Sequence, residues 1–141
     1  MTSRLYHLQI NVSSTESARS LYRDLFRYLE WRVIHDEGGV TAFSDGTVNI
    51  WLIPTEGSFA VRGFHRKGTG LNHLAFRVER REDVDQFRDE FLAPRGMATL
   101  YDTPREFPEY RPGYYAIFFE DPDRLKLTSR PACRTPRTSF C

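Results

Sequence analysis

The sequence predicts an α+β fold made of two βαβββ modules, which form a curved mixed sheet around a cavity with the helices on its outer face. An alternating polar and apolar segment opened by a histidine occurs at residue 7 and again at residue 73. Each copy is followed by an amphipathic helical pattern and then by three short apolar segments separated by turn signals. A duplication of this kind is stronger evidence for a fold than any single motif.

The first copy begins with the segment His7-Leu8-Gln9-Ile10-Asn11-Val12. Its strict alternation predicts a half-buried strand, with the apolar side chains on one face. Residues 18–29 then place apolar side chains at helical spacing, which predicts an amphipathic helix. The three strands that follow are expected at residues 31–35, 40–43 and 48–53.

The second copy begins with His73-Leu74-Ala75-Phe76-Arg77-Val78, which matches the first at the His, Leu and Val positions. A helix carrying Val84, Phe87, Phe91 and Leu92 is expected next, followed by strands at 97–101, 114–119 and 125–128. We therefore predict a single domain over residues 1–130, with modules at 4–54 and 70–130. Residues 131–141 lack periodicity and are expected to form a flexible tail.

Composition excludes several classes of partner. The chain has 141 residues with 20 Lys and Arg against 19 Asp and Glu. Its net charge of +1 gives no overall electrostatic attraction to nucleic acid. No apolar run approaches the roughly 20 residues that span a bilayer, and no signal-peptide pattern opens the chain. We expect a cytoplasmic protein without a membrane partner.

The polar faces of the two histidine-bearing strands are the candidate site. In the first strand this face carries His7, Gln9 and Asn11, and in the second His73, Ala75 and Arg77. Such side chains are either solvated or line a cavity. The two histidines are therefore either hydrogen-bonding polar residues or ligands of one metal ion, since neutral imidazole binds Zn²⁺, Ni²⁺, Mn²⁺ and Fe²⁺.

Four stretches carry a family resemblance: His7, Ser20-Leu21-Tyr22-Arg23-Asp24-Leu25, residues 70–78 (Gly-Leu-Asn-His-Leu-Ala-Phe-Arg-Val) and residues 118–123 (Phe-Phe-Glu-Asp-Pro-Asp). With them, the chain resembles the vicinal oxygen chelate superfamily over residues 4 to about 130. That superfamily includes glyoxalase I, extradiol dioxygenases, and bleomycin and fosfomycin resistance proteins. The resemblance implies paired βαβββ modules around a divalent metal.

The resemblance assigns two metal ligands and leaves a third position without its usual residue. His7 and His73 match the histidine ligands on the first and fifth strands. The usual glutamate lies five residues after the Asp-Pro-Asp turn, where this chain has Thr128. Glyoxalase-type members have an acidic residue on the fourth strand, near Trp51, and that position is not acidic here either.

The remaining candidates are ligand-binding residues. Trp51, Tyr114 and Phe118 would stack on a ligand in the cavity, or serve only as strand aromatics. Arg77 is either a rim residue or an anchor for a carboxylate or phosphonate. Gln9 and Thr128 complete the expected lining.

Two functions follow from the resemblance. One is a metal-dependent lyase, transferase or dioxygenase, in which the metal binds two adjacent substrate oxygens and stabilises an enolate-like intermediate. The other is a metal-free protein that sequesters a drug or metabolite, as in antibiotic resistance. Single-domain members of the superfamily usually pair, so we also expect a homodimer.

Overall fold

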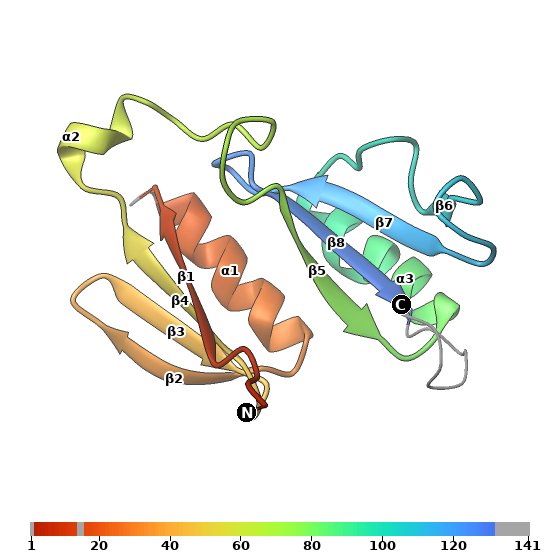
Figure 1. Ribbon diagram of the computed structural model, residues 1–141, viewed down its shortest axis with the longest axis horizontal. Helices are drawn as coiled ribbons and strands as arrows, with labels where there is room; N and C mark the ends of the chain where they lie inside the picture. Colours follow the sequence, from red (N-terminus) through yellow and green to blue (C-terminus); the bar gives the residue numbers. More distant parts are fainter. Residues whose placement is uncertain (1, 14–15, 132–141) are drawn as a thin grey trace. The chain divides into compact units, whose positions relative to one another are not determined.

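The computed structural model describes residues 2–13 and 16–131. It confirms the predicted α+β class, with two four-stranded mixed sheets and helices packed on them (Figure 1). The chain divides into two compact units, residues 1–64 and 65–141, which are described separately below. Each unit contains one of the two sheets.

The first unit contains β1 (His7–Val12), α1 (Glu16–Tyr28), β2 (Arg32–Glu37), β3 (Val40–Ser44) and β4 (Asn49–Pro54). Its strand order is β1-β4-β3-β2, with β1 parallel to β4 and the other neighbours antiparallel. A short helix, α2 (Gly57–Ala60), follows β4 and lies between the predicted modules at 4–54 and 70–130.

The second unit repeats this arrangement. It contains β5 (His73–Val78), α3 (Arg81–Phe87), β6 (Arg105–Glu106), β7 (Tyr115–Glu120) and β8 (Lys126–Pro131). The strand order β5-β8-β7-β6 is the same as in the first sheet, and β5 is again parallel to β8. The common topology confirms the predicted duplication.

Three details differ from the prediction. The predicted helix is α3 followed by a π-helical turn (Arg88–Leu92) and a 3₁₀ turn (Ala93–Arg95). The predicted strand at 97–101 is only an isolated bridge between Thr99 and Phe119. The last strand runs beyond Thr128 to Pro131, which is paired with Val78, so residue 131 belongs to β8 and not to the tail. Residues 132–141 lie outside the described part.

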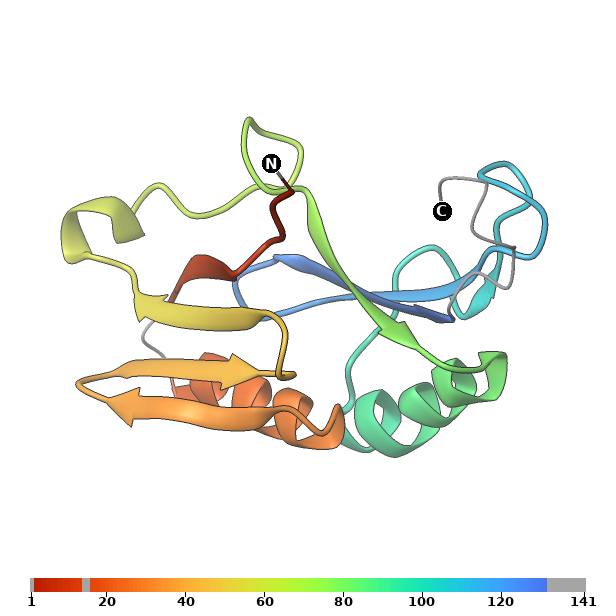
Figure 2. The ribbon, with the colours of Figure 1, turned by 60° about the horizontal axis from the view of Figure 1, so that its bottom comes forward.

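The helices α1 and α3 each cover one face of the sheet in their own unit (Figure 2). On the first sheet, the ring of Phe26 in α1 stacks on Phe43 of β3 at 4.3 Å between centroids. On the second sheet, Phe87 of α3 packs against Phe119 of β7 at 5.5 Å. All four side chains are buried. The helices therefore leave one face of each sheet, here called its open face, to carry the candidate site residues.

Candidate functional site

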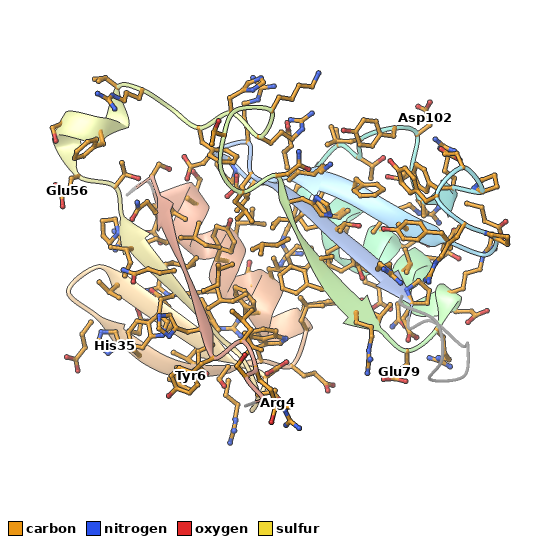
Figure 3. All side chains as sticks on the ribbon, viewed as in Figure 1. Arg4, Tyr6, His35, Glu56, Glu79 and Asp102 are labelled. Atoms are coloured by element: carbon orange, nitrogen blue, oxygen red, sulfur yellow. The ribbon has the colours of Figure 1, made fainter. Side chains whose placement is uncertain are left out.

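On the first sheet, strand register places the candidate residues in rows across the open face. Gln9 on β1 lies opposite Trp51 on β4, which lies opposite Ala42 on β3, and Ala42 lies opposite His35 on β2. Side chains that are paired across strands share a face of the sheet. The rings of His35 and Trp51 approach to 5.4 Å, and Figure 3 labels His35 on its strand. The sequence reading missed His35 as a site residue, because the register shift between Val33 and His35 breaks the regular alternation of β2.

The same register holds on the open face of the second sheet. His73 lies opposite Lys126, Ala75 opposite Thr128, and Arg77 opposite Arg130. Thr128 also lies opposite Phe118 on β7. The structure therefore brings four predicted residues onto one face, namely His73, Arg77, Phe118 and Thr128.

The two histidines have different surroundings within their units. His7 is exposed and makes an edge contact with the ring of Tyr6 at 5.7 Å. The Nδ1 atom of His73 is 2.9 Å from Oδ1 of Asn72, a hydrogen bond that leaves Nε2 for another partner. Desolvation, followed by the positive charge of Lys126, holds the pKa of His73 below its ordinary value. His7 and His73 belong to different units, so the hypothesis that they share one ion stays a prediction.

The third ligand position of the superfamily is occupied by a buried hydroxyl. Thr128 is 0% exposed, and its Oγ1 donates a hydrogen bond of 2.7 Å to the carbonyl oxygen of Ile117. Trp51 holds the corresponding position of the first sheet. Trp51 is paired with Gln9, two residues after His7, just as Thr128 is paired with Ala75, two residues after His73. A zinc or facial iron site needs a third protein ligand besides two histidines. The Thr128 hydroxyl is neutral and already hydrogen-bonded, and the Trp51 side chain is an indole. Neither provides that third ligand.

The carboxylate in the same row as His73 is engaged elsewhere. Glu120 shares the row of His73 and Lys126, but it forms an ion pair with Arg66 and lies 3.8 Å from Arg124. Within residues 2–13 and 16–131, no group of three or more His, Cys, Asp or Glu side chains could hold a metal ion. The donor set of the described residues thus lacks the charge that a divalent ion prefers.

An aromatic cluster lies beside Thr128 in the second unit. Phe118 and Phe107 are buried with their rings edge to face at 5.4 Å, and Tyr114 packs against them. The Arg130 guanidinium lies 4.8 Å from the centre of the Tyr114 ring, and Lys126 Nζ lies 5.4 Å from that of Phe118. The sequence reading missed Arg130 because it ended the strand at Thr128. The alternation Lys126-Thr128-Arg130 would have revealed it.

No helix among the described residues is both long and apolar enough to cross a membrane.

Comparison with known proteins gives a consistent family. The sequence model of the Glyoxalase/Bleomycin resistance protein/Dioxygenase superfamily matches residues 4–128. The uncharacterized protein YqjT of Bacillus subtilis (strain 168) is 28% identical over 130 residues, covering 92% of this chain and all of that protein.

Two solved structures illustrate the similarity. A glyoxalase candidate from Bacillus halodurans is 34% identical with a TM-score of 0.82, over 91% of this chain and 95% of its own. The fosfomycin resistance protein FosX of Listeria monocytogenes is 19% identical with a TM-score of 0.66, over 95% and 97%. The second likeness is one of fold alone. With its repeated βαβββ topology and the match over residues 4–128, this chain belongs to the Glyoxalase/Bleomycin resistance protein/Dioxygenase superfamily.

Proposed function

We propose that this chain is a small-molecule-binding protein that holds its ligand on the open faces of its sheets without the superfamily's carboxylate-completed metal site. The observation that carries the proposal is Thr128, a buried hydroxyl bonded to the Ile117 carbonyl where the metal-binding glutamate is expected. The related superfamily members that sequester or inactivate antibiotics make a drug or metabolite the natural ligand class.

Electrostatics around His73 support the proposal. A carboxylate at residue 128 would offset part of a dication's charge, whereas a hydroxyl offsets none. Lys126 lies directly opposite His73, and desolvation together with this ammonium group lowers the pKa of that ring. The same positive charge opposes the binding of a second cation there.

Restoring the missing carboxylate tests this proposal. The Thr128→Glu variant should bind Zn²⁺ or Mn²⁺ at least about tenfold more tightly than the parent chain, because it adds an anionic ligand beside His73. Thr128→Gln has nearly the same size without the charge and should show no such gain. Isothermal titration calorimetry on protein purified without a nickel column measures both. If Thr128→Glu does not fold, Trp51→Glu provides the corresponding change in the half-buried position of the first sheet.

A divalent ion bound by the unmodified chain would contradict the proposal. If the unmodified chain carries about one divalent ion that His73→Ala removes, and Thr128→Glu does not tighten it, the metal-free proposal is wrong. Elemental analysis of the purified chain and of His73→Ala measures this directly.

That outcome would favour a second candidate function, a divalent-metal-dependent lyase, transferase or dioxygenase. The retention of both His7 and His73 supports this candidate. These two residues would then hold the ion, and a bound divalent metal would supply Lewis-acid chemistry to a substrate with two adjacent oxygens.

Assembly as a homodimer is part of the proposal, since it rests on the family alone. Sedimentation of the chain at micromolar concentration should give the mass of a dimer. A monomer across that range would contradict it.

A further inference from the structure

The open face of the second sheet carries cations that the first sheet does not have. Arg77 lies opposite Arg130, and Lys126 lies opposite His73. The matching positions of the first sheet are uncharged, namely Asn11, Ile53 and Asn49. Because the two sheets share topology and register, the fold itself does not require these charges.

The pairing of Arg77 with Arg130 is unfavourable on its own. Neighbouring strands lie about 4.8 Å apart, so the two side chains leave the sheet side by side. Like charges in such positions repel. In the part of the chain that the structure describes, neither arginine nor Lys126 forms an ion pair. Glu120, the acidic residue in the same face, is already paired with Arg66.

Aromatic rings position these cations without neutralising them. The Arg130 guanidinium lies over the half-buried ring of Tyr114, and the ammonium of Lys126 lies over the ring of Phe118. Cation–π contacts leave the positive charge available to an anion. The row of Arg77 and Arg130 therefore places guanidinium donors beside the flat ring of Tyr114.

We propose that Arg77 and Arg130 anchor the oxyanion of a small aromatic acid whose ring lies against Tyr114. A guanidinium group binds a carboxylate or phosphonate through two parallel hydrogen bonds. An anion between the two arginines also removes their mutual repulsion. This inference rests on the proposed ligand-binding function and adds the charge and shape of the ligand.

Three probes test it on the full chain: benzoate, phenylphosphonate and the neutral benzamide. Thermal stability and the amide NMR signal of Ala75, which lies between the cationic rows, report binding. At least one of the two anions should raise the melting temperature, and benzamide should not. The stronger of the two anions identifies a carboxylate or a phosphonate as the preferred group.

Variants assign the binding to the arginine pair. Arg130→Gln should weaken the bound probe at least about tenfold, the loss expected for a charge-assisted hydrogen bond. Arg27→Gln changes the net charge equally on the exposed surface of α1 and should leave the affinity unchanged. Without probe, Arg130→Gln should raise the melting temperature in the parent chain and not in the Arg77→Gln background.

Several results would overturn the inference. These are binding of neither anion, binding of benzamide as tight as benzoate, or an equal loss of affinity in Arg27→Gln and Arg130→Gln. Tight binding of benzamide would remove the anion site and leave the proposed ligand-binding function in place. The metal titrations of Thr128→Glu decide that broader function independently.

Discussion

Replacement of Thr128 by valine should lower the free energy of unfolding by about 1 kcal/mol, the typical net value of an intramolecular hydrogen bond. The hydroxyl is 0% exposed and donates to the Ile117 carbonyl at 2.7 Å. Valine has nearly the same shape, so the substitution removes the hydrogen bond and leaves little cavity. It thereby isolates the hydroxyl that occupies the third metal-ligand position.

The magnitude converts to a measurable shift in melting temperature. An unfolding entropy of about 2.1 cal/mol/K per residue gives about 0.3 kcal/mol/K for this chain of 141 residues. A loss of 1 kcal/mol therefore lowers the midpoint by about 3 °C, which calorimetry and thermal circular dichroism resolve. Thr47→Val, at an exposed turn position, is the matched control and should change the stability by less than about 0.5 kcal/mol.

A Thr128→Val protein as stable as its parent, or more stable, would refute this reasoning. The hydroxyl would then not be committed to the Ile117 carbonyl. Its oxygen would be free to serve as a weak ligand, and the case against a metal site would lose its main support.

Three further predictions concern the two sheets. Phe119→Ala should cost about 3–5 kcal/mol in urea unfolding because that side chain is fully buried, whereas Phe59→Ala, at a side chain 54% exposed, should cost far less. Lys126→Gln should raise the pKa of His73, measured by NMR titration of its ring protons. Desolvation still lowers that pKa, but the neighbouring positive charge is gone. Gly46→Ala should cost about 1 kcal/mol in the same unfolding assay, because φ is +93° at this hairpin position.

Each of these has a clear contrary result. Equal losses for the two phenylalanine variants would contradict the assigned core. An unchanged His73 titration in Lys126→Gln would mean that the two side chains do not interact across β5 and β8. An alanine at residue 46 without cost would mean that the turn adopts another conformation.

Much of the fold was predictable because it follows from local periodicity. The alternation of His7–Val12 and its repeat at 73–78 defined two half-buried strands, and the helical stripes between strands defined the layers. Both are properties of side-chain spacing along one segment. The prediction of a strand at 97–101 was wrong, because this segment forms only a single bridge to Phe119. The number of backbone hydrogen-bond partners that a segment finds in the folded chain is not contained in its local pattern.

The candidate site divides along the same line. The sequence by itself determined which residues alternate with the core, including His73 and Arg77, and it identified Thr128 at the position where the family has a glutamate. Only the tertiary structure decided that Arg77 and Arg130 lie side by side and that the Thr128 hydroxyl donates a hydrogen bond to a backbone carbonyl. Register between strands that are far apart in sequence depends on packing and hydrogen bonding of the whole sheet, and one segment's pattern does not contain that information.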